Sequence, residues 1–238
     1  MAFNPALIVV DLQEDFLPPS GSLAVTDGRD IIPAILELTD LEKYNWKTII
    51  ATKDWHPQDH CSFASNNNVA PYSKVWFSHP LGEKDPITHE VKKRLETVWP
   101  DHCVQDSRGS EFPAEFQAQW DILEQSATST HLVKKGYLKD REYYSAFEDV
   151  WKLHHTELED ILVSEKITHV FTVGLACDFC VVNTSIDSAS LGFPTFSIKE
   201  CSRSVYPDKQ KETDELYEEN NVKLISLNSD ILKKVEKH

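Results

Sequence analysis

The sequence has no run of 18 or more apolar residues, so it offers no segment that could span a bilayer as a helix. Its first residues, MAFNPALIVVDLQEDF, lack the basic region and the small-residue cleavage site of a secretory signal peptide. The last residues, KKVEKH, do not form a peroxisomal S-K-L-type signal. These absences predict a cytoplasmic protein that is not secreted and has no membrane partner. A nuclear or peroxisomal location is left open.

Positive charge is scarce, since 24 Lys and Arg residues stand against 39 Asp and Glu residues and leave a net charge of −15. Such a surface repels a phosphate backbone, so we expect no nucleic-acid partner. The five cysteines are an odd number without an export signal, which favours reduced thiols over a disulfide framework. Neither an internal repeat nor a low-complexity linker is present, and residues 1–238 are expected to form a single domain.

Short apolar runs recur along the chain, and most are continuous rather than alternating, as in strands covered on both faces. They lie at residues 6–11, 47–54, 131–136, 168–175, 194–200 and 222–227, and helical patterns separate them at 28–44, 141–166, 180–192 and 208–220. This alternation predicts an α/β protein, a three-layer sandwich with an open, mainly parallel sheet flanked by helices. Two polar segments, at about 57–100 and 103–130, break the pattern and are expected to be long loops near the active site.

Reactive side chains stand where the predicted strands end. They are Asp11 after the first strand, Asp54 and His56 at the second, Lys135 at the third, and Cys180 shortly after the fourth. Because ligands of an open parallel sheet bind outside the carboxyl ends of its strands, we expect these groups to share one rim.

The pair Cys177 and Cys180 forms a C-x-x-C motif with several interpretations. A structural zinc site would need a second close pair of ligands, and the other three cysteines are scattered singly. A thioredoxin-like motif would follow the first strand rather than the fourth. Both residues could also be small buried hydrophobes.

A fourth interpretation makes Cys180 a nucleophile. The segment passes through Gly174 into a helix whose N-terminus is expected near Cys180, where free amides stabilise a thiolate and hold an oxyanion. Asp11 is then the acid–base partner and Lys135 the charge partner. The alternatives are a helix N-cap for Asp11 and a solvated surface residue for Lys135.

Five segments, taken in order, resemble the nicotinamidases of the isochorismatase-like cysteine hydrolase family. They are DLQEDFLPPSGSLAV, TKDWHPQDHCSF, VWPDHC, KKGYLKDREYYSAF and VGLACDFCVVNTSIDSASLGF. The resemblance runs in register from about residue 6 to residue 227, and the KGYLKDREYYSAF segment is especially similar to fungal members. It implies hydrolysis of nicotinamide to nicotinate and ammonia, in NAD salvage.

For the catalytic groups, the resemblance implies that Cys180 forms a thioester, with Asp11 as general acid and base and Lys135 as its charge partner. It places the oxyanion hole at the backbone N–H groups of Ala176 and Cys180, with a cis peptide bond between Leu175 and Ala176. Cys177 takes a place that Thr commonly holds in the family, so the C-x-x-C motif would be accidental.

The D-x-H pair of Asp54 and His56 could share a cation, since side chains two apart at a strand end point the same way. Chance and N-capping explain many such pairs. The resemblance adds His102 as a third ligand of one divalent metal ion, for which zinc suits the ligand set best and iron or manganese are alternatives. His60 is expected beside the site rather than on the metal. The remaining histidines are expected to be solvated or to lie on helix surfaces: His79, His89, His131, His154, His155, His169 and His238.

The resemblance also implies an aromatic substrate pocket that contains Phe16, Trp99 and Tyr144, although each could be an ordinary core residue. Such a pocket would accept pyrazinamide as well as nicotinamide. Two other functions compete: an isochorismatase-like hydrolase of N-carbamoyl amides or vinyl ethers, and a non-catalytic zinc or redox protein. A homo-oligomer is compatible with the family, whose members range from monomers to larger rings.

Overall fold

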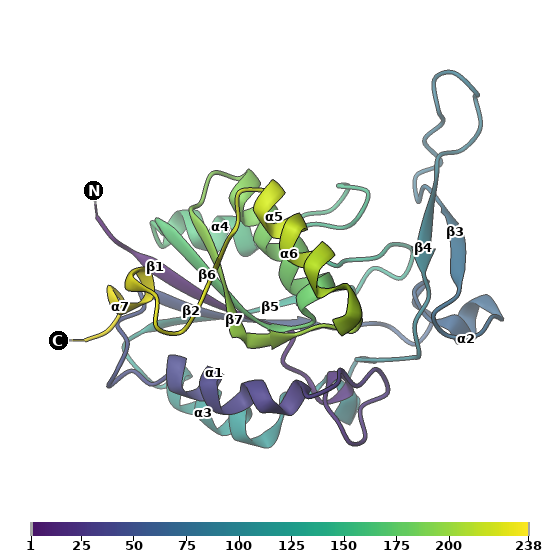
Figure 1. Ribbon diagram of the computed structural model, residues 1–238. Coiled ribbons are helices and arrows are strands. Elements are labelled where there is room, and N and C mark those ends of the chain that lie inside the picture. The colour runs from purple at the N-terminus through teal and green to yellow at the C-terminus, as the bar shows by residue number, and fades with distance from the viewer. Residues whose placement is uncertain (1, 238) are drawn as a thin grey trace.

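Six strands form a central sheet in the order β5–β2–β1–β6–β7–β8, and every pairing in it is parallel (Figure 1). The strands are β1 (Pro5–Val10), β2 (Thr48–Asp54), β5 (Ser129–Lys135), β6 (His169–Leu175), β7 (Thr195–Arg203) and β8 (Lys223–Ile225). The computed structural model describes residues 2–237. The predicted α/β class is confirmed, and each of the six predicted strands is present within a few residues of its expected bounds.

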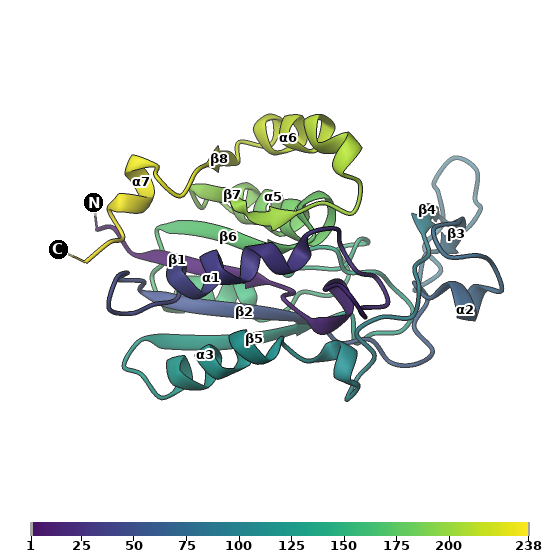
Figure 2. The ribbon, with the colours of Figure 1, turned by 60° about the horizontal axis from the view of Figure 1, so that its bottom comes forward.

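Helices cover both faces of the sheet (Figures 1 and 2). On one face lie α1 (Ile32–Leu38) and α3 (Ala114–Glu124), and on the other lie α4 (Leu158–Ser164), α5 (Val182–Ser190) and α6 (Gln210–Glu219). Two single-turn helices are α2 (Ala64–Asn67) and α7 (Asp230–Lys233). Short 3-10 turns occupy Glu14–Phe16, Gly28–Ile31, Arg108–Ser110 and Pro207–Lys209, and Cys177–Val181 forms a π-helical turn before α5.

The first strand divides the core in two. Leu7 and Val9 belong to the cluster that includes α1 and α3, whereas Ile8 and Val10 pack with Leu158 of α4 and its neighbours. Successive side chains of a strand point to opposite faces, so a continuous apolar strand supplies both clusters at once. This is why β1 contains no polar residue, and why Asp11, the next residue, lies at the edge of the sheet.

The two segments expected to be long loops contain regular structure, so that prediction is partly wrong. Within 57–100, β3 (Lys74–Ser78) and β4 (Lys93–Thr97) form an antiparallel hairpin that extends away from the body of the molecule (Figure 1). Within 103–130, α3 buries Phe116, Trp120 and Leu123 against the sheet. These three apolar positions follow the helical period, but the polar residues between them obscure it.

The predicted helices were too long in two places. The first ends at Leu38 rather than residue 44, and of 141–166 only Leu158–Ser164 is helical. In the non-helical part, the Asp149 carboxylate accepts hydrogen bonds from the backbone N–H groups of Trp151, Leu153 and His154. Such side-chain bonds compete with a helix for the backbone donors. Among the described residues, no helix has both the length and the apolar character to cross a membrane.

Candidate active site

The reactive side chains from the strand ends lie together at one edge of the sheet, as predicted. The ligand atoms of Asp11, Asp54 and Cys180 lie within 4.8 Å of one another, and all three residues are buried. Asp11 leaves β1 with a φ of 45°, and its Oδ1 accepts a hydrogen bond from Thr52 Oγ1 (2.5 Å). Since Thr52 lies on β2, the neighbouring strand holds this carboxylate in place.

Lys135 connects these groups. Its Nζ lies 2.9 Å from Asp11 Oδ2, 2.5 Å from Asp54 Oδ1 and 3.4 Å from Cys180 Sγ. It also donates a hydrogen bond to the Tyr143 carbonyl oxygen (2.9 Å). The side chain is fully buried, so it is not a solvated surface lysine. Asp11 in turn caps no helix, because the N-cap of the following 3-10 turn is Gln13.

Burial dominates the electrostatics of this cluster. It raises the pKa of Asp11, an effect that Lys135 only partly offsets. Burial likewise raises the pKa of the Cys180 thiol well above its usual range, against the opposing effect of Lys135. Burial would lower the pKa of Lys135, but Asp11 and Asp54 outweigh it and raise that pKa well above its ordinary value. The resting site therefore holds a protonated thiol and a charged lysine.

A helix begins near Cys180, as predicted, because the π-helical turn that contains it leads directly into α5. Burial nevertheless raises the pKa of the Cys180 thiol, which opposes a thiolate in the resting protein. The Leu175–Ala176 peptide is cis, as predicted. Gly174 precedes it with a φ of +116°, and a Cβ there would lie 2.0 Å from the Val10 carbonyl oxygen. Outside the hydrogen bonds of the strands and helices, the Ala176 N–H donates to no backbone acceptor among the described residues.

Cys177 faces a different part of the molecule. Its Sγ lies 3.7 Å from Tyr217 Oη and 3.7 Å from Gln210 Nε2, both on α6. It packs in a cluster with Val182 and Tyr217, whereas Cys180 packs with the β1 side chains. All five thiols are free. The motif is therefore neither a disulfide nor half of a metal clasp.

A second cluster, adjoining the first, contains Asp54, His56 and His102, whose ligand atoms lie within 4.8 Å of one another. The Nε2 atoms of His56 and His102 lie 3.7 and 3.9 Å from Asp54 Oδ2. His56 Nε2 is buried and has no hydrogen-bond partner among the described residues. Burial, with His56 nearby, lowers the pKa of His102 to about 4, so this imidazole is neutral. An unpartnered imidazole nitrogen beside a carboxylate and a neutral imidazole fits a divalent cation.

The surrounding backbone orients both imidazoles. His56 Nδ1 contacts the Gly136 carbonyl oxygen (2.9 Å), and His102 Nδ1 contacts the Pro100 carbonyl oxygen (2.7 Å), which leaves both Nε2 atoms for a ligand. Gly136 has a φ of +73°, and a Cβ at this position would lie 2.4 Å from the His56 ring. The residue after Lys135 must therefore be glycine for His56 to occupy its place.

Several histidines outside the cluster are less exposed than predicted, since His131, His154 and His169 are half-buried. His60 stacks on His56 at 4.0 Å, and its two ring nitrogens contact Ser62 Oγ and the Arg141 carbonyl oxygen, so it lies beside the cluster as expected. His79 was expected to be solvated but is buried against Trp151, with ring centroids 4.8 Å apart. His155 and His89 are exposed, and His238 lies outside the described residues.

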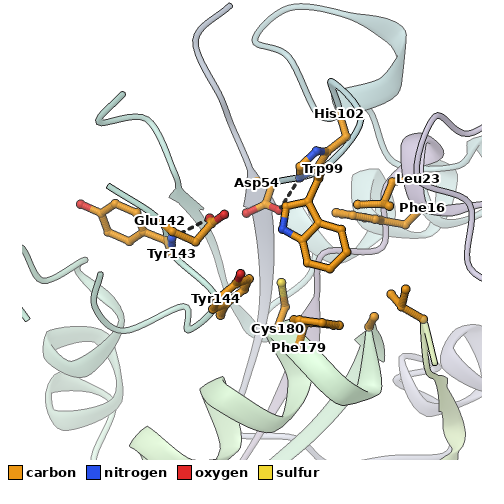
Figure 3. A pocket seen from close by; sticks show the side chains of 12 residues that line it. Phe16, Leu23, Asp54, Trp99, His102, Glu142, Tyr143, Tyr144, Phe179 and Cys180 are labelled. Atoms are coloured by element: carbon orange, nitrogen blue, oxygen red, sulfur yellow. Dashed lines mark hydrogen bonds and ion pairs between the residues drawn. The ribbon is translucent and has the colours of Figure 1, made fainter. Parts of the chain in front are cut away.

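A pocket lies above Cys180 and is largely aromatic (Figure 3). Phe16, Trp99 and Tyr144, the three residues expected there, all line it, together with Phe179. Trp99 and Phe179 form an edge-to-face pair at 4.9 Å, and Tyr144 lies 5.5 Å from Phe179. Asp54 and His102 reach its upper side in the figure, so the two clusters and the aromatic rings share one space.

Two residues at this site escaped sequence reasoning. Glu142 is buried and lines the pocket, and burial raises the pKa of its carboxyl group. Gln13 accepts a hydrogen bond from the Asp54 N–H and donates one to the Asp54 carbonyl oxygen (2.8 Å each). Glu142 stands in the charged segment KDRE, which gave no signal of burial. Gln13 lies two residues after Asp11, and its contact with Asp54 on β2 arises only in the folded chain.

A buried Cys–Asp–Lys cluster at the carboxyl edge of an open parallel sheet defines a cysteine hydrolase of the α/β class. The chain belongs to the isochorismatase family, whose Isochorismatase domain matches residues 5–229.

Known relatives agree with this assignment. The nicotinamidase of Saccharomyces cerevisiae is 36% identical over 206 residues, which cover 86% of this chain and 90% of that protein. The structure of the yeast nicotinamidase Pnc1p superimposes with a TM-score of 0.82 at 33% identity, over 93% of this chain and 99% of that one. A pyrazinamidase of Pyrococcus horikoshii, solved in complex with zinc, superimposes with a TM-score of 0.68 at 26% identity. The match covers 94% of this chain and 99% of that one. The resemblance to fungal nicotinamidases is confirmed.

Proposed function

We propose that the protein is a nicotinamidase, which hydrolyses nicotinamide to nicotinate and ammonia. The observation that carries this proposal is the position of Lys135 Nζ, 2.9 Å from Asp11 Oδ2 and 3.4 Å from Cys180 Sγ, beneath an aromatic pocket. A thiol, a carboxylate and an ammonium group in contact can cleave a carboxamide by acyl transfer. The relatives named nicotinamidase support this choice of amide.

In the first step, Cys180 Sγ attacks the amide carbonyl carbon while Asp11 takes the thiol proton. A base is required because burial raises the pKa of the thiol, and burial also raises the pKa of Asp11, which favours its taking the proton. The Lys135 charge opposes this rise and favours the ionised form of Asp11 before the attack. The carbonyl oxygen becomes an oxyanion, which the backbone N–H groups of Ala176 and Cys180 would stabilise.

The intermediate then collapses. Asp11 passes its proton to the nitrogen, the C–N bond breaks, and ammonia leaves a thioester on Cys180. In the second half, water attacks the thioester carbon and gives a proton to Asp11. The C–S bond breaks, nicotinate forms, and the sulfur recovers the proton from Asp11. One amide and one water thus become one acid and one ammonia, and the three side chains return to their starting states.

Asp54, His56 and His102 would hold one divalent cation, with zinc as the proposed ion. The unpartnered His56 Nε2 and the Asp–His–His donor set support it, as does the zinc complex of the Pyrococcus horikoshii relative. When bound, the cation supplies a ligand position for the pyridine nitrogen, which fixes the ring above Cys180. The rings of Phe16, Trp99 and Tyr144 would bind its faces and exclude water.

Pyrazinamide should be a second substrate. It differs from nicotinamide by one ring nitrogen in place of a C–H group, and an apolar aromatic pocket discriminates weakly between rings of equal size. We expect kcat/KM values within about tenfold of each other, measured as ammonia release at matched concentrations. Cleavage of nicotinamide without any cleavage of pyrazinamide would contradict the proposed binding of the ring.

The main test is ammonia release from nicotinamide by the purified protein, with two matched cysteine variants. Cys180→Ser should lower kcat by at least about three orders of magnitude, because the attacking thiolate is lost. Cys177→Ser should keep most of the activity, since its sulfur faces α6 rather than the pocket.

Equal loss of activity in both cysteine variants would contradict the proposal and favour a redox pair. If the intact, metal-loaded protein released no ammonia from nicotinamide, a panel of N-carbamoyl amides and vinyl ethers would test the other reactions expected of this fold. Activity on that panel alone would replace the proposed substrate but leave the nucleophile in place.

The proposal extends to the cellular setting. Nicotinate is a pyridine that NAD salvage can use, and we place the enzyme in that route and in the cytoplasm. The five free thiols support a reducing compartment. Fluorescence microscopy of a tagged chain would test the location, and sedimentation of the purified protein would test whether it forms a homo-oligomer.

A further inference from the structure

A second groove adjoins the catalytic pocket. It lies between the base of the β3–β4 hairpin, with Tyr72 and Lys74, and the turn that precedes α6, with Tyr206 and Lys209. Phe179 lines both the groove and the catalytic pocket, so one ring separates the two spaces. Neither the proposed attack by Cys180 nor the metal cluster uses this outer groove.

Aromatic rings run without interruption from the pocket to the outer groove. Trp99, on the pocket wall, contacts Phe179 at 4.9 Å and Tyr72 at 5.8 Å. Phe179 in turn lies 6.0 Å from Tyr206. Tyr72 is 51% exposed, so its ring is open to solvent. Planar ligands bind such rings at low entropic cost, because aromatic side chains have few rotatable bonds.

Two lysine side chains, Lys74 and Lys209, line the outer groove. Lys74 Nζ donates a hydrogen bond to Thr97 Oγ1 (2.7 Å), and Lys209 Nζ lies 5.6 Å from the Tyr206 ring. Among the described residues, neither ammonium group forms an ion pair with a carboxylate. Both therefore keep charge available for a ligand.

Two carboxylates also face the outer groove. Asp178 accepts hydrogen bonds from the backbone N–H groups of Val205 and Tyr206, at 2.9 and 2.8 Å, and keeps its negative charge. Glu212 is the other carboxylate, so two ammonium groups and two carboxylates line the groove. The groove thus combines stacking surfaces with two ammonium groups that have no carboxylate partner among the described residues.

We infer that the outer groove is a second binding site for aromatic monocarboxylates, and specifically for the product of the proposed reaction. This inference rests on the proposed function, because hydrolysis converts a neutral carboxamide into an anion. The two lysines attract the anion and give no such attraction to the neutral substrate. Nicotinate leaving the pocket would pass Phe179 and bind between Tyr72 and Tyr206.

The first test needs no turnover. Equilibrium dialysis of the metal-loaded protein against labelled nicotinate should show two sites per chain. The weaker of the two sites is expected to be the outer groove. In the Lys74→Gln/Lys209→Gln variant its affinity for nicotinate should fall about tenfold, as expected for the loss of two partly exposed charge contacts. Raising the salt concentration should weaken the same site in the unmodified protein, because exposed charges are screened. Lys211→Gln is the matched control, since Lys211 is 90% exposed and pairs with Glu215 outside the groove.

The second test is product inhibition. With nicotinate in the outer groove while nicotinamide occupies the catalytic pocket, inhibition should be mixed, and benzoate should inhibit in the same way. The Lys74→Gln/Lys209→Gln variant should show competitive inhibition only, with kcat within about twofold of the unmodified protein. The single variant Lys209→Gln leaves the hairpin unchanged. Its inhibition by nicotinate should be mixed, but with a weaker uncompetitive component than in the unmodified protein.

A single dialysis site that the lysine variants do not affect would overturn the inference, as would purely competitive inhibition. The two proposals can fail separately. A protein that does not cleave nicotinamide would refute the proposed function. A protein that cleaves nicotinamide, but binds nicotinate at one salt-independent site, would refute the outer groove alone.

Discussion

At the scale of single residues, Lys135 makes the central contacts of the site. Its buried ammonium group forms ion pairs with two carboxylates, Asp11 and Asp54, and also contacts Cys180 Sγ. It thereby joins the catalytic cluster of Asp11, Lys135 and Cys180 to the proposed metal cluster of Asp54, His56 and His102. Removing one partner of a buried ion pair commonly costs about 3–5 kcal/mol, because the other charge stays buried without compensation. Any substitution of Lys135 thus affects stability together with activity, which makes it a poor probe of mechanism.

Gly136 is a better probe of the metal cluster. In Gly136→Ala, the new Cβ would meet the His56 ring at 2.4 Å, and alanine would have to adopt a φ of +73°. We expect the variant to lose bound divalent metal and about 1–3 kcal/mol of the free energy of unfolding. Mass spectrometry of bound metal and urea unfolding measure the two effects.

The matched control for Gly136→Ala is Gly192→Ala. Gly192 also has a positive φ, +91°, but a Cβ there would meet nothing within 4 Å. The control should lose about 1 kcal/mol from backbone strain alone and keep its metal. Full metal content in Gly136→Ala would mean that the His56 ring is not held as the structure places it.

At the scale of elements, the β3–β4 hairpin combines two parts with different environments. Its base leads through Val98 and Trp99, both buried, toward His102. Its tip extends away from the body, with Leu81 72% and Ile87 85% exposed (Figure 2). An isolated two-stranded hairpin is marginally stable, so the base must be held by the packing of Trp99 and its neighbours rather than by the tip.

Shortening the hairpin tests this division. Replacement of residues 80–91 by Asn-Gly, the usual two-residue hairpin turn, should leave kcat/KM for nicotinamide within about twofold. The backbone bond from His79 N–H to the Lys92 carbonyl oxygen (2.8 Å) shows that the strands are already close enough to join there. In contrast, Trp99→Ala should raise KM by about tenfold or more, because a wall of the pocket is removed. A large loss of activity in the shortened protein would show that the tip takes part in the reaction.

At the scale of the whole molecule, the metal cluster would join segments that are far apart in sequence. Asp54 ends β2, His56 follows it, and His102 comes from beyond the hairpin. A ligand that binds only the folded chain stabilises it by mass action, by about 2.7 kcal/mol at a hundred times its dissociation constant. Chelation should therefore lower the unfolding temperature by about 5–10 °C, and zinc should restore it, as measured by calorimetry. Cys180→Ser should show the same shift, and an unchanged unfolding temperature after complete metal removal would argue against the site.

Part of this architecture could be predicted from the sequence because it depends on local pattern. Most of the six strands are continuous apolar runs, and Asp11, Asp54 and Lys135 stand at or directly after strand ends. The carboxyl ends of parallel strands meet at one edge, so their convergence follows once the sheet is inferred. The irregular course of 141–157 could not be predicted, because it depends on Asp149 binding three backbone donors.

By itself, then, the sequence determined the parallel α/β class, the strand-end positions of the reactive side chains and, through its motifs, the family. Only the tertiary structure decided which partners those side chains meet. It brought Lys135 between Asp11 and Asp54, turned Cys177 toward α6, and buried Glu142 in the pocket. These outcomes depend on contacts between segments that lie far apart along the chain, and on the low-polarity interior that makes each charge require a partner. Neither is visible in a local pattern of residues.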